Sequence, residues 1–394
     1  MSIIIDNKIE KKERSSYKAK ILCIFFFLAT SSVYFFPDII TNLFKPVLII
    51  FLFFSILFSN ERLRINSITL VTTFALLYFS IIFLVNGVSF RSFSGYVWLA
   101  LYLAIILILS TLKFTRKDFE VIIQSIYIGG FLFALCILIS NPDITGMSVM
   151  NRMDVKYLNT TINANGISYI IIPGILIGLH KIILSNNINK FKHIILVCIM
   201  LYPIFYSMSR GGFLALFIGT LFVILHYIKY YSIKINVVKI MSIILTIIIL
   251  TITTYSFIPQ NIQNRLFSFT SYELNNRDAL WEQAFTLAKN NLVFGSGYSF
   301  YWENTGYSYG SHNLFIDLLV STGLIGAILM VLVLFLVIIK SKKNLILYSF
   351  LTTSIVNSMV ESGNSYSFWI PIIITTIFTR FSSNINKDFQ EIFK

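Results

Sequence analysis

Long apolar runs recur along the whole chain, and they restrict the fold more than any other feature of the sequence. Runs of roughly 20 residues, the length that crosses the hydrocarbon core of a bilayer, alternate with short polar segments. Of the 394 residues, 56% are hydrophobic and 12% are charged, against about a quarter charged in an ordinary soluble domain. We therefore predict an all-α polytopic membrane protein that forms a single integral membrane domain over residues 1–394.

The runs predict about twelve transmembrane helices. The first is expected to be retained, because the segment before it is polar and basic and no small-residue cleavage pattern follows it. The three cysteines sit in separate apolar runs, so their spacing predicts neither a disulfide nor a metal site. The predicted spans lie near 21–36, 39–58, 67–85, 93–112, 119–139, 163–184, 193–208, 211–229, 239–258, 312–339, 344–360 and 364–380.

The distribution of Lys and Arg indicates how the chain is oriented. With the N-terminus inside, the cytoplasmic segments hold 23 of the 31 basic residues, as the positive-inside rule requires. Both termini are then cytoplasmic, and the segments 140–162 and 259–311 are extracytoplasmic. The net charge of +14 is explained by this loop bias and by anionic lipid headgroups, so we do not expect a nucleic-acid partner.

Arginine is over-represented among the basic residues that this orientation places outside. It supplies five of those eight residues but only five of the 23 inside. The planar, permanently charged guanidinium suits bidentate binding of phosphate or carboxylate, which topology alone does not require. The bias indicates an anionic ligand on the outer face. The five outer arginines are Arg91, Arg152, Arg210, Arg265 and Arg277.

Segment 259–311 is the only long polar excursion between two apolar runs. Connections of this length are usually functional or disordered, and its aromatic content argues against disorder. We predict that it is an extracytoplasmic catalytic loop. Within it, residues 275–289 predict a short amphipathic helix on the outer membrane interface, anchored by Trp281. Arg277 falls in the first turn, where a cation is unfavourable unless an anion is near; a salt bridge to Asp278 or Glu282 is the alternative.

Arg210 lies in Ser207-Met-Ser-Arg-Gly-Gly212, a turn that opens the eighth predicted span. A helix N-terminus favours an anion, and the double glycine lets a ligand or another helix approach the backbone. An interfacial arginine that extends to lipid headgroups, with glycines for helix packing, is equally consistent with this pattern.

After a turn at Gly295-Ser-Gly297, an aromatic stretch includes Tyr298, Tyr301 and Trp302. Such rings stack on sugars, but interfacial aromatic belts have the same composition. His312 is the one histidine predicted outside, where the loop becomes a helix, and a neutral imidazole there can accept a proton from a hydroxyl nucleophile. A structural histidine is the alternative.

Two other functional classes fit less well. A transporter, such as a flippase for lipid-linked glycans, needs several ionisable groups at mid-membrane depth, whereas Asp317 is the clearest one in the predicted spans. A non-catalytic scaffold leaves the outer arginine bias unexplained.

Three segments resemble the O-antigen polymerase/ligase superfamily of bacterial inner-membrane glycosyltransferases. They are SMSRGGFLAL (207–216), NRDALWEQAFTLAKNNLVFGSGYSFY (276–301) and SHNLFIDLLVSTGLIGAIL (311–329), in the order typical of the family. NTTINANGISYIIIP (159–173) is a looser match. The resemblance implies a fold similar to the membrane-embedded C-type glycosyltransferases and transfer of a glycan from undecaprenyl diphosphate to a hydroxyl on the periplasmic or outer face, with no metal or other cofactor.

Carried over by motif, the resemblance implies His312 as the general base, with Arg210 and Arg277 holding the diphosphate. Arg152 and Arg265 are weaker candidates for the same cluster, and the expected glycan or diphosphate contacts are Trp281, Tyr298, Tyr301, Trp302 and Asn313.

The resemblance also implies partners and a location. These are the undecaprenyl-diphosphate-linked glycan, membrane lipid, and chain-length-regulator and flippase proteins, in the bacterial inner membrane. A polymerase of repeat units, making O-antigen or capsular polysaccharide, is favoured over a ligase that attaches the finished glycan to lipid A–core or protein.

Overall fold

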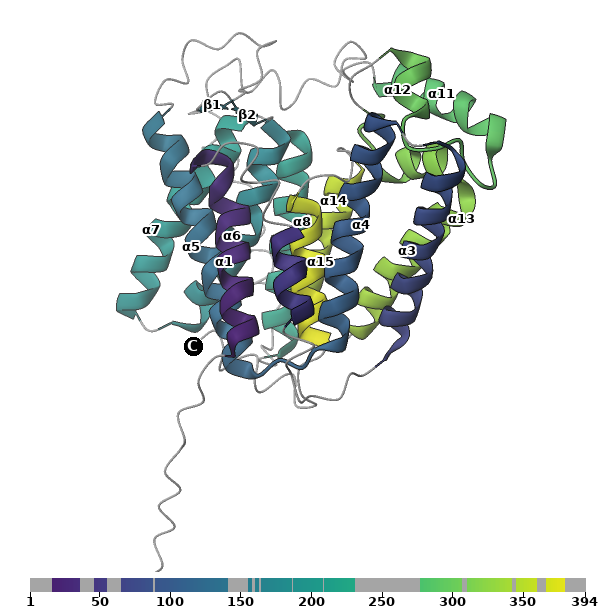
Figure 1. Cartoon of the computed structure of the whole chain (residues 1–394). Coiled ribbons are helices and arrows are strands. Elements are labelled where there is room, and N and C mark those ends of the chain that lie inside the picture. The colour runs from purple at the N-terminus through teal and green to yellow at the C-terminus, as the bar shows by residue number, and fades with distance from the viewer. Residues whose placement is uncertain are drawn as a thin grey trace, which may run out of the picture.

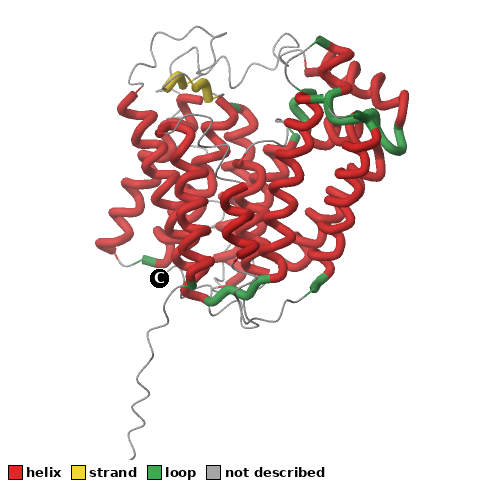
Figure 2. Tube along the Cα trace, in the orientation of Figure 1, coloured by secondary structure: helices red, strands yellow, loops and turns green. Residues whose placement is uncertain are grey.

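Helices account for nearly all of the secondary structure in the described part of the chain (Figures 1 and 2). The computed structural model describes residues 16–35, 46–54, 65–87, 89–140, 155–157, 160–162, 164–185, 187–207, 209–230, 277–306, 310–341, 345–359 and 366–379. The elements are α1 (Tyr17–Phe35), α3 (Ser67–Val85), α4 (Phe90–Thr111), α5 (Arg116–Ser140), β1 (Val155–Tyr157), β2 (Thr160–Ile162), α6 (Ala164–Leu184), α7 (Asn187–Ser207), α8 (Arg210–Tyr230), α11 (Arg277–Ala288), the 3₁₀ turn η2 (Lys289–Asn291), α12 (Phe300–Thr305), α13 (Leu314–Lys340), α14 (Leu345–Ser358) and α15 (Tyr366–Thr379).

The predicted all-α polytopic architecture is confirmed. Within the described ranges, seven helices are long and apolar enough to cross a membrane, namely α3 to α8 and α13. Helices α14 and α15 are described over 14 residues each, within the spans predicted at 344–360 and 364–380. The predicted span 239–258 lies outside the described residues, and of 39–58 the structure describes 46–54, which is helical.

One small hairpin departs from the all-helical prediction. Strands β1 and β2 pair antiparallel, with Val155 opposite Ile162 and Tyr157 opposite Thr160. The hairpin lies at the same end of the bundle as α11 and α12 (Figure 1). Segments 140–162 and 259–311, which the charge pattern assigned to one side of the membrane, therefore have their described parts at one end of the molecule.

Helix ends are fixed by side chains that cap free backbone groups. Asn66 accepts from the backbone N–H groups of Ile68 (2.8 Å) and Thr69 (3.1 Å), while the Thr69 hydroxyl accepts from the Asn66 N–H, which completes a capping box at the start of α3. The Asn66 amide also donates to the Ser110 carbonyl at 2.8 Å, so the start of α3 is tied to the end of α4.

Helix α13 is broken at Gly323, where φ is +68° and ψ is −170°. The sequence predicted one uninterrupted apolar span here, so the break is a correction. Backbone groups left unpaired at hydrocarbon depth cost several kcal/mol each, and a break is therefore stable only if other groups bond to them.

The loop between η2 and α12 supplies these partners. It runs beside the break and exchanges backbone hydrogen bonds with both halves of α13. The bonds run from the N–H of Leu324 to the carbonyl of Leu292 (2.9 Å), from Ile325 to Val293 (3.4 Å), from Ser296 to Val320 (2.9 Å) and from Gly297 to Ser321 (3.0 Å). The Tyr78 hydroxyl of α3 donates to the Thr322 carbonyl at 2.8 Å and so satisfies a further group at the break.

Glycines make this close approach of two backbones possible. A Cβ at Gly295 would lie 2.4 Å from the Thr322 nitrogen, and a Cβ at Gly323 would lie 2.3 Å from the Val293 carbonyl oxygen. Gly295 and Gly297 have φ of +78° and +98°, which confirms the turn predicted at Gly295-Ser-Gly297. The glycines of two separate sequence motifs thus meet in one contact.

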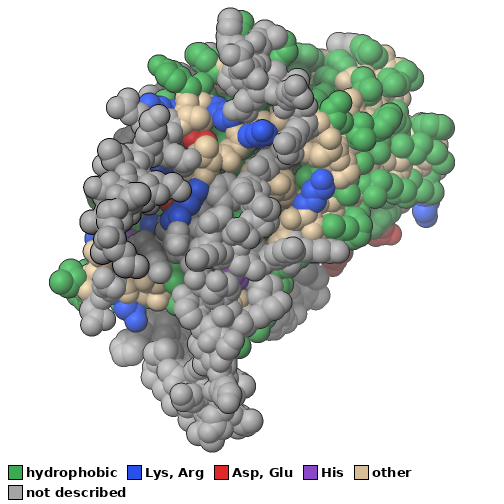
Figure 3. Space-filling view, turned by 90° about the horizontal axis from the view of Figure 1, so that it is seen from below, with side chains coloured by type: hydrophobic (Ala, Val, Ile, Leu, Met, Phe, Trp, Pro, Cys, Tyr) green, Lys and Arg blue, Asp and Glu red, His purple; other side chains and the backbone are tan. Residues whose placement is uncertain are grey.

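The face opposite to the hairpin is seen in Figure 3, where Lys and Arg side chains (blue) are spread over its described part. Helix α5 starts and α6 ends on this side of the bundle, and the Ser16 N–H donates to the Asp118 carboxylate at 2.6 Å, so α1 starts there too. This is the end that the positive-inside rule predicts to be cytoplasmic.

We predict that Gly323→Ala destabilises the protein more than Gly306→Ala. Both glycines have positive φ, but Gly306 lies in the left-handed helical region (φ +71°, ψ 0°), which costs an alanine roughly 1–2 kcal/mol. Gly323 (φ +68°, ψ −170°) lies in a region that is essentially restricted to glycine, so an alanine is strained there by its backbone as well. A Cβ at Gly306 meets no atom within 4 Å, whereas at Gly323 it overlaps the Val293 backbone. The melting temperatures of the two purified variants in detergent test this; equal losses would contradict the packing described here.

Candidate functional site

The connection into α13 places His312 between two constrained residues. Every polar backbone and side-chain group of the buried Ser311 is bonded. Its N–H donates to the Asp317 carboxylate at 2.7 Å, its hydroxyl donates to the Asn313 carbonyl at 3.2 Å, and its carbonyl accepts from the Trp281 indole N–H at 3.0 Å. Residues from α11 and from the first turn of α13 therefore fix the backbone immediately before His312.

His312 itself has a left-handed backbone, with φ of +56°. Among the described residues it is the one non-glycine with positive φ, a conformation that costs a side-chain-bearing residue free energy and is found at functional sites more often than elsewhere. Asn313 follows it and caps α13, where its side-chain oxygen accepts from Phe315 (3.0 Å) and Ile316 (3.2 Å). The half-buried His312 is thus held on a rigid corner.

Helix α11 is the predicted amphipathic helix, and it packs on α13. Leu280, Ala284 and Ala288 are buried, at the i, i+4, i+8 spacing of one helix face. The predicted interfacial anchor, Trp281, instead contacts the protein, since it bonds to Ser311 and packs in the same cluster. Phe285 is the aromatic ring that α11 exposes.

The other three aromatic residues predicted to bind glycan, Tyr298, Tyr301 and Trp302, also take part in packing. Tyr301 is 5% exposed and donates to the Leu280 carbonyl at 3.4 Å, so it joins α12 to α11. Tyr298 and Trp302 are partly buried against Gly95 of α4, where a Cβ would lie 3.3 Å from Tyr298 and 3.5 Å from Trp302. A role for these rings in glycan binding stays a prediction.

Tyr298 and Trp302 each bury a donor. No described residue accepts from the Tyr298 hydroxyl or from the Trp302 indole N–H. Burial raises the pKa of Tyr298 well above its ordinary value, and the neighbouring Tyr96 and Tyr78 raise it further, so this hydroxyl stays protonated at neutral pH.

Arg210 is the first residue of α8, as predicted. Ser209 before it caps the helix, accepting from the Gly212 N–H at 3.0 Å, and its hydroxyl donates to the Asn165 side chain at 2.7 Å. Ser207 and Ser168 share a further buried hydrogen bond of 2.7 Å between their hydroxyls. Arg210 therefore projects from a turn that is bonded to the start of α6.

The sequence left open whether the double glycine at 211–212 lets a ligand or another helix approach the backbone. At Gly212 it is another helix. A Cβ there would lie 2.4 Å from the Cβ of Ser168, so Gly212 admits a neighbouring helix to close contact with the backbone.

Arg277 is half-buried and is the first residue of α11, which confirms the predicted helix start within two residues. Arg152 and Arg265 lie outside the described residues.

The packing of α11, α12 and α13 brings together Trp281, Tyr301, Asn313 and the backbone around His312. Arg210 lies on α8, which packs against α6 and α14. Convergence of the three proposed catalytic side chains on one ligand stays a prediction. In the described part of the chain, no three His, Cys, Asp or Glu side chains gather as metal ligands.

Sequence reasoning missed the residues that position the site. Asp317 was noted as an ionisable group in an apolar helix but not as the acceptor for Ser311, and its position in the first turn of a helix was the available signal. Asn165 and Ser168 lie in the loosely matching segment 159–173, but no local pattern connects Asn165 to Ser209, 44 residues away, or Ser168 to Ser207, 39 residues away.

We predict that Gly212→Ala lowers thermal stability and that Ser168→Gly restores part of the loss. The added methyl group overlaps Ser168, and removal of the Ser168 side chain opens the space again, so the two changes should be strongly non-additive. A double-mutant cycle on melting temperature measures this coupling. Additive effects would show that the two helices do not meet at this point.

The comparisons with known proteins agree with the resemblance drawn from the sequence. Residues 195–331 match the family model described as O-Antigen ligase. No curated protein shows a significant match to the chain. The matched interval contains the three proposed catalytic residues, and the turn at Arg210, helix α11 and the break in α13 all fall inside it. Over residues 195–331, this multi-pass membrane protein is therefore similar to the O-antigen ligase family, which confirms the resemblance to the O-antigen polymerase/ligase superfamily.

Proposed function

We propose that this protein transfers a glycan from undecaprenyl diphosphate to a sugar hydroxyl, with His312 as the general base. The family match supports polymerase or ligase activity in general. The observation that carries the specific proposal is the clamp on Ser311, by which we mean the hydrogen bonds of its backbone to Trp281 and Asp317. This clamp fixes the backbone just before His312, which is left-handed and is followed by the cap of α13. A base must be held at a fixed position relative to the hydroxyl it deprotonates, and a rigid corner provides this.

Arginine side chains have the second role in this proposal. When the glycosidic bond to the carrier breaks, the departing lipid diphosphate needs cations that are already in place, because preorganised charge requires no rearrangement during the reaction. Arg210 and Arg277 are each the first residue of a helix, and a helix N-terminus adds its own partial positive charge for a phosphate. Arg152 and Arg265 are proposed as weaker members of the same cluster.

The orientation of the chain completes the proposal. The hairpin, α11 and α12 lie at the end predicted to be extracytoplasmic, and the Lys-bearing ends of α5 and α6 lie at the opposite end (Figures 1 and 3). We place the site on the outer face of the bacterial inner membrane, with both termini cytoplasmic and with chain-length-regulator and flippase proteins as partners.

Within the superfamily we favour a polymerase, with a ligase as the alternative. Chain size and a single main outer loop fit a polymerase slightly better. Deletion of the gene distinguishes the two, because loss of a polymerase leaves single repeat units and loss of a ligase leaves long polymer on its lipid carrier. A gel of the polysaccharide reads this directly. A flippase is separated by incubating the purified protein with lipid-linked oligosaccharide, since a flippase forms no new bond.

We predict that His312→Asn reduces glycan transfer by about 100-fold or more. Asparagine tolerates the left-handed backbone but cannot accept a proton at neutral pH, so the corner is kept while the base is lost. Transfer by the purified protein is the measurement, with melting temperature as the check on folding. His193→Asn makes the same change on α7, outside the site, and should keep near-normal transfer. Transfer at the normal rate by His312→Asn would exclude His312 as the base.

We predict that Arg210→Lys and Arg277→Lys each lower transfer by about tenfold or more, because a lysine keeps the charge but not the bidentate fork. Arg116→Lys, at the opposite end of the bundle, serves as the matched control. Full activity of both outer variants would show that transfer does not require a bidentate guanidinium at either position.

Trp281 has two possible roles that kinetics can separate. If it positions His312 through Ser311, Trp281→Phe removes the indole donor but keeps a ring, and kcat should fall about tenfold with little change in KM. If the ring binds glycan, as the sequence suggested, KM should rise instead. We expect the first result because the indole N–H is engaged with the Ser311 carbonyl.

A further inference from the structure

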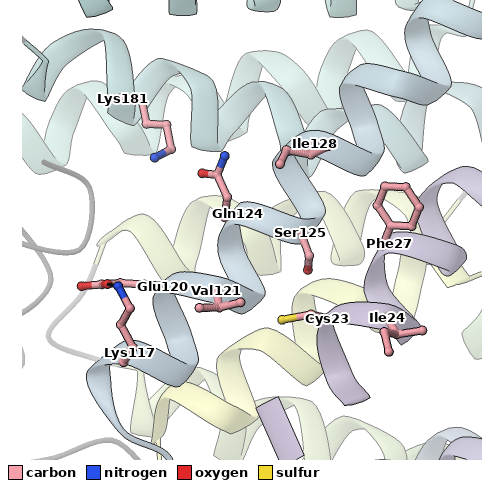
Figure 4. Close-up of a pocket in the computed structure, with 10 residues that line it drawn as sticks. All are labelled: Cys23, Ile24, Phe27, Lys117, Glu120, Val121, Gln124, Ser125, Ile128 and Lys181. Carbon is pink, nitrogen blue, oxygen red and sulfur yellow. Dashed lines mark hydrogen bonds and ion pairs between the residues drawn. The ribbon is translucent and has the colours of Figure 1, made fainter. Parts of the chain in front are cut away.

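A cavity of about 640 Å³ lies between α1, α5 and α6, at the end of the bundle opposite to the proposed catalytic site (Figure 4). Its walls come from residues 23–27 of α1 and 117–128 of α5, with Lys181 of α6. None of these residues takes part in the proposed transfer reaction, so the cavity needs an explanation of its own.

One end of the cavity is polar and has an excess of positive charge. Both carboxylate oxygens of Glu120 are engaged, one by Lys117 at 3.1 Å and the other by Arg116 at 3.1 Å. Lys181 lies within electrostatic range of Glu120 and Lys192 but has no ion pair with a described residue. The described ionised side chains around this end include Arg116, Lys117, Lys181 and Lys192 against the carboxylates of Glu120 and Asp118, which leaves a positive excess.

Gln124 adds an amide to the same end. Its side chain is exposed, and none of the described residues forms a hydrogen bond with it. Figure 4 shows Lys181 and Gln124 pointing toward one another, with the Lys117–Glu120 pair apart from them, nearer the start of α5. An ammonium and an amide that converge in this way are suited to a phosphate oxygen, which accepts from both.

The remainder of the cavity is apolar and open to the side. Ile24 is 60% exposed and Ile128 is 41% exposed, and Val121 lines the wall between Ile128 and the lysines. In a membrane-spanning bundle such side chains face lipid rather than water. The cavity is therefore an amphipathic recess that a molecule can enter from the bilayer.

The recess runs along one face of α5. The lining residues Lys117, Val121, Gln124 and Ile128 recur at three- and four-residue spacing, so they form a stripe along one face of α5. Eleven residues of helix separate the first from the last, a rise of about 16 Å.

We infer that this recess binds an anionic phospholipid from the leaflet at that end, which the charge pattern makes the cytoplasmic one. Its phosphate contacts Lys181 and Gln124, Lys117 adds positive charge to the same end, and one acyl chain lies along Val121, Ile128 and Ile24. A zwitterionic lipid gains less, because its own cation is repelled by the same lysines. The inference concerns a lipid of the surrounding bilayer, and it does not depend on the proposed glycan transfer.

Native mass spectrometry of the purified full chain tests the inference, after exchange into detergent with equal amounts of phosphatidylglycerol and phosphatidylcholine. The intact protein should retain phosphatidylglycerol in preference. Each lysine near an anionic headgroup contributes about a fivefold change in binding, so Lys117→Gln with Lys181→Gln should weaken retention by about 25-fold. Ile128→Trp fills the apolar stripe without a change in charge, and it should also reduce retention.

Lys190→Gln is the matched control, because it removes one positive charge from the exposed first turn of α7 and does not line the recess. It should leave retention unchanged, and melting temperatures should show that all variants fold. Equal retention of both lipids by the intact protein would overturn the inference. So would equal retention by the double lysine variant and the control, or a loss in the control as large as in the double variant.

Discussion

The exchange of backbone hydrogen bonds between the broken helix α13 and the loop at 291–297 is the interaction on which the outer end of this protein depends. A helix that crosses a bilayer normally satisfies its own backbone, and a break at Gly323 removes that internal pairing. Here the backbone of the loop supplies the missing donors and acceptors on both sides of the break. The Tyr78 hydroxyl of α3 contacts both partners, the Thr322 carbonyl of α13 and the Phe294 carbonyl of the loop, and glycines allow the two backbones to approach.

The same contact between the loop and α13 positions the residues around His312. The first half of α13 carries Asp317 and the cap residue Asn313, and it is positioned by the same contact that holds the loop. Helix α11 precedes that loop in the chain and packs back on α13, which brings the Trp281 indole to Ser311. His312 is therefore set by tertiary contacts on both sides, although it lies at the edge of a loop where conformational freedom would otherwise be greatest.

The two ends of the molecule offer different chemistry to the membrane and its lipids. At the outer end, Arg210 and Arg277 begin helices, and the proposed reaction needs their charge for a departing diphosphate. At the opposite end, lysines surround a recess with an apolar wall, and the inferred ligand is an ordinary phospholipid. The preference for arginine outside and lysine inside, visible in the sequence, corresponds to this division.

The sequence by itself determined the class of fold, the ends of most helices and the motifs of the candidate site. Apolar runs of membrane-crossing length, the Asn-rich start of α11 and the turn at Gly295–Gly297 are local signals, because they depend on neighbouring residues in the chain. Only the tertiary structure decided the break in α13, the contact between Gly212 and Ser168, and the clamp on Ser311. Each joins groups that are distant in the sequence, up to 244 residues apart for Tyr78 and Thr322. A local pattern cannot predict which distant backbone or side chain packs beside a glycine.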